Sequence, residues 1–98
     1  MSFRHVTMFR WKPETPAGHD EAVRSTLQTF AATLQGCRSY VCGPDAGVME
    51  GTFDFCVIAE FEDRAAWDHY MTDPEHDRIR AEVIGPYALE RATIQLEG

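Results

Sequence analysis

The sequence predicts an α+β domain in which strands and helices follow one another in the order β-α-β-β-α-β. Three of the four predicted strands show the every-second-residue alternation of apolar side chains that is typical of strands. Two longer segments show apolar side chains three or four residues apart, as in helices. Proline and glycine residues separate these segments. A length of 98 residues, with 44% hydrophobic and 26% charged residues, indicates one globular domain over residues 1–98.

The first predicted strand covers residues 3–12. One of its faces carries mostly aromatic side chains: Phe3, His5, Thr7, Phe9 and Trp11. Val6 and Met8 lie on the other face, so both faces are largely apolar and we expect both to be covered.

The first predicted helix covers residues 16–35, and its apolar stripe consists of Val23, Leu27, Phe30, Ala31 and Leu34. We expect Thr15 to cap its start and Gly36 to cap its end, since these residue types are favoured there. His19 is expected to be a solvated surface residue near the start of the helix.

Two strands are predicted after this helix, over residues 37–42 and 53–62, with a turn over residues 43–47 after the first. The second is the clearest strand in the chain, because its apolar residues alternate strictly: Phe53, Phe55, Val57, Ala59 and Phe61. Cys56 and Ile58 lie on its opposite face.

The final third of the chain is predicted to form a divided helix and a strand. Asp63 is the expected N-cap of a helix over residues 64–72, and Pro74 then interrupts it and starts a second piece over residues 75–84. The last strand covers residues 88–96.

This order of elements is the ferredoxin-like βαββαβ motif, a four-stranded antiparallel sheet with helices on one face. Helices on one side cannot cover the second face, which carries Val6, Met8, Cys56 and Ile58. The simplest cover is the same face of a second copy, so we expect a homodimer through this sheet face.

Charge and composition exclude several classes of function. The net charge of −7 repels phosphate backbones and acidic membrane surfaces, so we expect neither nucleic acid nor a membrane as partner. The start of the chain lacks the apolar segment of about 7–15 residues found in secretory signals, and a cytoplasmic location is expected. Three cysteines without Cys-x-x-Cys spacing indicate free thiols, not a disulfide framework or a zinc site.

Three residues are candidates for acid–base chemistry: His5, Tyr70 and His76. His5 lies on an apolar strand face and needs a polar partner, either as a satisfied core histidine or as a pocket residue. Pro74 lies between Tyr70 and His76, so both can project into one gap between helices and sheet. A tyrosine hydroxyl beside a neutral imidazole suits proton transfer at an oxygen or at a carbon next to a carbonyl.

The acidic segment from Asp73 to Asp77 could alternatively hold a hard cation together with a histidine. Carboxylates at a helix start more often face the positive end of the helix dipole, so we predict no metal site. The sequence lacks a phosphate loop, a dinucleotide fingerprint and a Ser-His-Asp set, and no cofactor is expected.

Four short motifs occur in order along the chain: His5-Val6 in a strand that ends Trp11-Lys12-Pro13, then Gly43-Pro44, then Glu60-Phe61-Glu62-Asp63, then Tyr70-x-x-x-Pro74-x-His76. With these motifs the chain resembles the stress-responsive dimeric α/β-barrel (Dabb) domain family along nearly its whole length. The resemblance implies a ferredoxin-like subunit, a homodimer whose two sheets form a barrel, and a pocket in each subunit between sheet and helices.

Members of this family include plant stress proteins and a plant polyketide cyclase, which closes a linear intermediate into a phenolic acid. The resemblance implies that His76 acts as the acid/base of such a site, that Tyr70 assists it and that His5 lines it. The family commonly has His at the position of Asp73, and a carboxylate there is expected to favour the protonated form of a nearby histidine.

Three functions are weighed for this pocket. The first is a non-catalytic dimer that binds a small hydrophobic or phenolic molecule or protects against stress. The second is a cofactor-independent cyclase, lyase or isomerase, and an oxygenase or haem-handling barrel of the same architecture is a third alternative. The expected walls of the pocket are Phe9, Leu27, Phe55, Val57, Ile79 and Tyr87.

Overall fold

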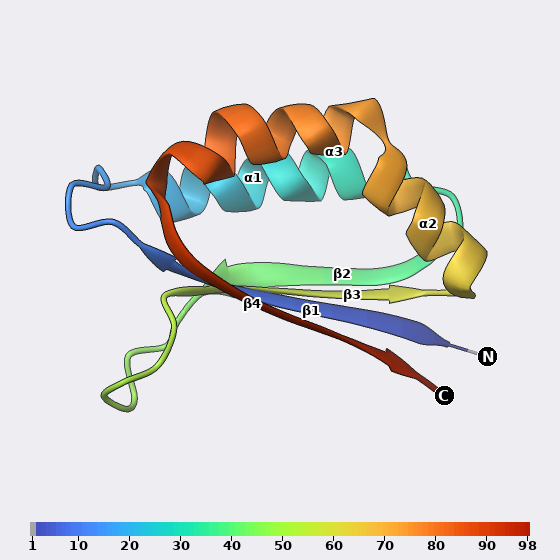
Figure 1. Cartoon of the computed structure of the whole chain (residues 1–98), viewed down its shortest axis with the longest axis horizontal. Helices are drawn as coiled ribbons and strands as arrows, with labels where there is room; N and C mark the ends of the chain where they lie inside the picture. Colours follow the sequence, from blue (N-terminus) through green and yellow to red (C-terminus); the bar gives the residue numbers. More distant parts are fainter. Residues whose placement is uncertain (1) are drawn as a thin grey trace.

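The computed structural model describes residues 2–98 as a sheet with a layer of helices on one of its faces (Figure 1). The predicted βαββαβ order is confirmed, with the following bounds: β1 (Phe3–Trp11), α1 (His19–Ala31), β2 (Cys37–Pro44), β3 (Phe55–Phe61), α2 (Arg64–Thr72), α3 (Pro74–Ile79), the π-helical segment η1 (Arg80–Ile84), the 3-10 turn η2 (Gly85–Tyr87) and β4 (Ala88–Glu97). No helix within residues 2–98 combines the length and apolar character needed to cross a membrane.

The four strands pair in the order β2-β3-β1-β4, and every pair is antiparallel. The central position of β1 gives it two partners, and its register places His5 directly opposite Gln95 of β4. Alternation along β1 turns His5 and Thr7 towards the helices, where both are buried, and turns Val6 and Met8 away from them.

The core lies between the sheet and the helices. From α1 it receives Val23, Leu27 and Phe30, which belong to the apolar stripe expected from their spacing. From β3 it receives Phe55 and Phe61, which are almost fully buried. The helices pack mainly over β1, β2 and β3, so the inward side chains of the edge strand β4 remain accessible.

The start of α1 differs from the prediction. The helix begins at His19 and not at residue 16, because the preceding residues form a separate turn that is closed by a hydrogen bond from His19 N to Pro16 O. Gly18 ends this turn with a φ of 87°, a left-handed conformation that glycine adopts without strain. Thr15 is therefore not the N-cap, and its hydroxyl donates to the carbonyl of Lys12 instead.

The prediction that His19 is a solvated surface residue is wrong. Its side chain is 8% exposed, and its ring makes edge contacts with Trp11 and Tyr87 at centroid distances of 4.7 and 4.8 Å. The reason is periodicity, because His19 precedes Val23 by about one turn and so lies on the buried stripe of α1. The helix ends at Ala31, short of residue 35, and the following residues turn into β2.

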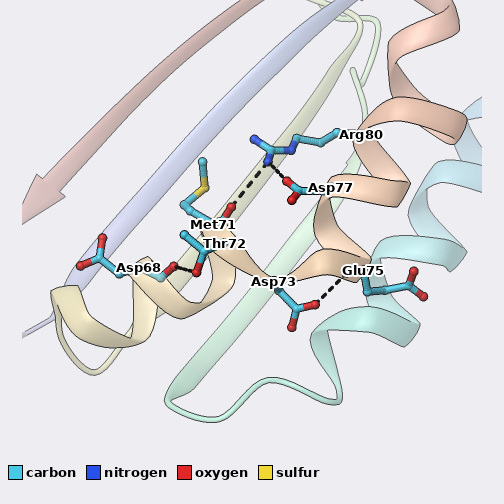
Figure 2. A network of polar contacts seen from close by, with 7 residues as sticks. All are labelled: Asp68, Met71, Thr72, Asp73, Glu75, Asp77 and Arg80. Carbon is cyan, nitrogen blue, oxygen red and sulfur yellow. Dashed lines mark hydrogen bonds and ion pairs between the residues drawn. The ribbon is translucent and has the colours of Figure 1, made fainter.

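Pro74 divides the second helical region, as predicted. A residue before proline avoids the helical conformation, and Asp73 has the extended backbone angles φ −65° and ψ 128°. Its carboxylate accepts a hydrogen bond from the backbone N–H of Glu75 and so caps α3, as Figure 2 shows. The break places Tyr70 at the end of α2 and His76 at the start of α3, both buried.

The helix after this break is not regular to its end. Residues 80–84, predicted as ordinary helix, form the π-helical segment η1, in which the N–H of Gly85 donates to the carbonyl of Arg80. A Cβ atom at Gly85 would lie 2.7 Å from that carbonyl oxygen. Glycine is therefore required here by the close approach of the backbone.

The sheet face away from the helices is apolar, as the alternation predicted. Ile58 of β3 is 44% exposed and Ile94 of β4 is 55% exposed. Val6 of β1 lies opposite both of them in the strand ladders, so the three side chains form a continuous strip across the sheet. We call this surface, together with Val41 and Leu96, the open face.

Candidate functional site

A cavity of about 220 Å³ lies between the inner face of the sheet and the helical layer. Inward residues of the strands form its floor, and α1, α2, α3 and η1 supply its other walls. The structure brings six of the predicted site residues into this lining: His5, Phe9, Leu27, Val57, Tyr70 and His76.

Three predicted wall residues lie outside the cavity. Phe55 and Ile79 are each 1% exposed and belong to the core. Phe55 sits at the first position of β3, where its ring packs against Trp11 at 5.8 Å. Tyr87 lies beyond the end of η1, where its ring packs against the ring of His19.

His5 is fixed by three polar contacts. Nδ1 lies 3.2 Å from the indole Nε1 of Trp67 and 3.0 Å from the side-chain nitrogen of Gln95, and Nε2 lies 2.9 Å from the hydroxyl of Thr7. An indole N–H can only donate, so Nδ1 carries no proton and Nε2 donates to Thr7. Burial, more than the nearby arginine charges, lowers the pKa of His5 to about 4.

His76 lies between two aromatic rings and is only 5% exposed. Its ring stacks on Phe30 at 5.8 Å and lies 4.2 Å from Tyr70. Nδ1 is buried without a hydrogen-bond partner within residues 2–98, which leaves Nε2 as the ring nitrogen that can meet a ligand. Burial, followed by the charge of Arg80, lowers the pKa of His76 to about 4.

The expected effect of Asp73 is confirmed in direction, but burial outweighs it. Its carboxylate does favour the protonated form of His76, but this effect is smaller than the opposing effect of burial, and the imidazole is neutral at pH 7. The carboxylate of Asp73 is also engaged in capping α3.

Tyr70 forms a pair with Tyr40 of β2, and their hydroxyl oxygens lie 3.1 Å apart. Burial raises the pKa of Tyr70 to about 12 and raises the pKa of Tyr40 further. A hydrogen bond from Tyr40 favours the ionised form of Tyr70, so Tyr70 is the more acidic member of the pair. Tyr40 lines the cavity and was not predicted, although its position two residues before Cys42 places both on one strand face.

Two arginines in the lining were also missed by the sequence analysis. Arg80, the first residue of η1, donates to the carbonyl of Met71 and pairs with the carboxylate of Asp77 (Figure 2). Arg91 lies on the inward face of β4 beside Thr93, and both are exposed, which marks this strand as the opening of the cavity. Alternation along the last strand was the signal that could have identified Arg91.

The carboxylates of the acidic segment are engaged locally. Glu75 pairs with Arg78 and Asp77 with Arg80, while Asp73 caps α3. Across residues 2–98, no three side chains of His, Cys, Asp or Glu lie close enough together to hold a metal ion.

The sequence matches the family model of the stress responsive A/B barrel domain over residues 3–97. No curated protein matches the chain in sequence. The family match therefore agrees with the order of the motifs along the chain and with the fold of the structure.

Solved structures share this fold over nearly the whole chain. A dimeric ferredoxin-like protein of unknown function from Thermobifida fusca is 28% identical, with a TM-score of 0.91 over 100% of this chain and 92% of its own. A ferredoxin-like Dabb family protein from Mesorhizobium loti is 16% identical, with a TM-score of 0.81 over 99% and 96% of the two chains. A hydroxynitrile lyase from Passiflora edulis is 13% identical, with a TM-score of 0.81 over 97% and 91%. At these identities the last two likenesses show the fold alone.

Proposed function

The chain belongs to the stress responsive A/B barrel domain family, and on this premise we propose that it binds a small hydrophobic or phenolic molecule in its cavity. The observation that carries the proposal is the composition of the lining. Apolar walls that include Leu27 and Val57 enclose a group of polar side chains around His5 and Tyr70. Sites for small organic molecules combine apolar walls with a few fixed polar groups in this way.

The volume of the cavity and the protonation states of its side chains define the kind of ligand. Its volume of about 220 Å³ is below the range of roughly 300–1,000 Å³ for drug-sized ligands, which favours a single ring or a short chain. The lowered pKa values of His5 and His76 and the raised pKa of Tyr70 keep all three groups neutral at pH 7. Neutral donors and acceptors suit a phenol or a carbonyl oxygen.

We further propose that two chains associate through the open face. An exposed apolar strip of this kind on a small domain favours association. The ion pairs Arg4–Glu60 and Arg10–Glu90 lie on the same side of the sheet, where they would form a polar rim. The similar protein from Thermobifida fusca is dimeric.

A thermal-shift experiment with simple phenols and phenolic acids tests the pocket. A ligand at about 100 times its dissociation constant adds about 2.7 kcal/mol to stability, which raises the melting temperature of a domain of this size by roughly 10 °C or more. Ala88 lines the cavity, so Ala88→Leu should fill part of it and reduce this shift. Ala65→Leu, on the exposed surface of α2, is the matched control and should leave the shift unchanged.

The proposal fails if no compound in the panel shifts the melting temperature. It also fails if the Ala88→Leu and Ala65→Leu proteins respond to a bound compound in the same way, because binding would then lie outside the cavity.

Acid–base catalysis is a second candidate, favoured by the position of His76. Its neutral imidazole keeps one nitrogen available to the cavity, 4.2 Å in ring-centroid distance from Tyr70, whose hydroxyl is the more acidic of a buried pair. In this proposal His76 removes a proton from carbon next to a carbonyl, and Tyr70 donates to the carbonyl oxygen. One protein with this fold, from Passiflora edulis, is a hydroxynitrile lyase.

Deuterium exchange separates this candidate from simple binding. The wild-type protein should speed the exchange of the protons next to the carbonyl of 4-phenyl-2-butanone in D₂O, as followed by NMR. His76→Gln should abolish the acceleration while the ketone still binds, because glutamine cannot accept the proton. If the ketone binds but its protons exchange at the uncatalysed rate, the acid–base candidate is wrong and binding remains the function.

A further inference from the structure

The cavity lining carries positive charge and no negative charge. Arg80 and Arg91 are its ionisable side chains with a fixed charge, and within residues 2–98 no Asp or Glu lines it. The chain as a whole has a net charge of −7, so this local excess of positive charge runs against the overall composition. Positive side chains gathered in one cavity of an acidic protein indicate a negatively charged ligand.

The two arginines differ in how far their charge is already compensated. The guanidinium of Arg80 pairs with Asp77 and donates to the carbonyl of Met71, so it is held in place from the helix side (Figure 2). Arg91 makes no ion pair and no side-chain hydrogen bond within residues 2–98. Its register opposite Phe9 on the inner face of the sheet places it at the cavity opening.

The charge of both arginines reaches into the cavity. Arg91 and Arg80 both contribute to the lowered pKa of His5, after the larger effect of burial. A free guanidinium presents a planar fork of N–H donors that matches one carboxylate.

A hydroxyl group next to Arg91 completes the arrangement. Thr93 Oγ1 lies 3.1 Å from the side-chain nitrogen of Gln95 and 3.1 Å from Thr7 Oγ1. Thr7 accepts from His5, and either hydroxyl of the Thr7–Thr93 pair can donate to the other. When Thr7 is the donor, the proton of Thr93 is left to donate to a ligand.

We propose that the ligand of this cavity is a small carboxylate with an apolar body, whose carboxylate is bound by Arg91 and Thr93 at the β4 opening while the body lies against Leu27 and Val57. This inference rests on the proposed binding function and narrows it to an anionic amphipathic molecule. Arg80 supports the site as a second, partly neutralised charge.

A pair of probes that differ in charge tests the inference: 3-phenylpropanoate and its neutral amide, 3-phenylpropanamide. Calorimetric titration of the wild-type protein should show tighter binding of the carboxylate. Arg91→Gln should weaken carboxylate binding by at least about tenfold, the scale of a charge-assisted hydrogen bond, and leave amide binding unchanged. Arg64→Gln removes the same charge from an exposed position at the start of α2 and should leave both affinities unchanged.

The outcomes separate this inference from the proposed function. If the amide binds as tightly as the carboxylate, and Ala88→Leu weakens both, the cavity binds small molecules but the anion preference is wrong. The same conclusion follows if Arg91→Gln weakens both probes equally, or if Arg64→Gln has the same effect as Arg91→Gln. If neither probe binds while a compound of the phenol panel raises the melting temperature, the inference is wrong and the binding function stands. If no compound of either set binds, both are wrong.

Discussion

Trp67 on α2 donates its indole N–H to Nδ1 of His5 on β1, across 3.2 Å. This contact connects the helical layer to the centre of the sheet and determines which nitrogen of His5 carries a proton. With Nε2 donating to Thr7, both nitrogens of the ring are engaged. His5 is therefore placed to position the polar groups of the cavity, whereas His76 keeps a nitrogen free.

Trp67→Phe should raise the pKa of His5 above its value of about 4, because protonation of Nδ1 would then displace one donor, the side chain of Gln95, and not two. Burial remains, so the pKa should stay below 6.5. NMR titration of the His5 ring protons measures it. Trp11→Phe is the control, because Trp11 donates its indole N–H to Asp20 and should leave His5 unaffected.

The stability of the protein should fall as the pH drops from about 6.5 to about 4. In this window the unfolded chain protonates His5 and His76, whose ordinary pKa is 6.5, while the folded protein does not until about pH 4. The unfolded state then binds more protons, so each histidine lowers the free energy of unfolding by up to roughly 3 kcal/mol at the acid end.

Urea denaturation at fixed protein concentration between about pH 7 and pH 4 measures this loss. His76→Gln should make the dependence shallower, and His69→Gln, at an exposed position, should not change it. Equal slopes in the wild-type and His76→Gln proteins would contradict the neutral, buried state of His76.

The Tyr40–Tyr70 pair should show coupling in a double-mutant cycle. Each single Tyr→Phe change leaves one buried hydroxyl without its partner and should cost about 1–3 kcal/mol. The double variant should be destabilised by about 1 kcal/mol less than the sum, because no hydroxyl is left unpaired. Strictly additive effects would show that the two hydroxyls do not interact.

Gly85→Ala should destabilise the protein by about 1–3 kcal/mol, because its Cβ would lie 2.7 Å from the carbonyl oxygen of Arg80. Gly43→Ala is the comparison, since the contacts of a Cβ atom there begin at 3.9 Å. The free energies of unfolding of the two variants should differ clearly. Similar values would mean that η1 can rearrange without loss.

Ile58→Asp should convert a dimer into monomers, because it places a charge in the centre of the open face. Sedimentation velocity at micromolar concentration measures the molar mass. Thr29→Asp adds the same charge on the exposed side of α1 and should leave the mass unchanged. A wild-type protein that sediments as a monomer would contradict the proposed dimer.

The strands and the helix break could be predicted from the sequence because local chemistry determines them. The alternation around Phe9 and Val57 defined the inner face, and Pro74 alone was sufficient to end one helix and start the next. The start of α1 could not be predicted in the same way. The turn before Gly18 competes with the helix that Pro16 would otherwise begin, and the sequence offers signals for both.

The cavity was predicted only in part, for a different physical reason. Periodicity shows which side chains face inward, but not which of them a neighbouring helix covers. Phe55 and Val57 share one face of β3, yet Trp11 packs over the first and the cavity lies over the second. The pKa of His76 likewise depends on the depth of burial, which the carboxylate of Asp73 in the sequence does not reveal.

The alternation of β1 and β4 has a consequence for how this protein can change. His5 and Thr7 of β1 and Arg91 of β4 face the cavity, whereas Val6 and Ile94 between them face the opposite side. Substitutions at the first set of positions would alter the ligand proposed for the cavity, and substitutions at the second set would alter the proposed dimer interface. Neighbouring residues on one strand can therefore evolve under separate selection, without a change in the fold that carries both.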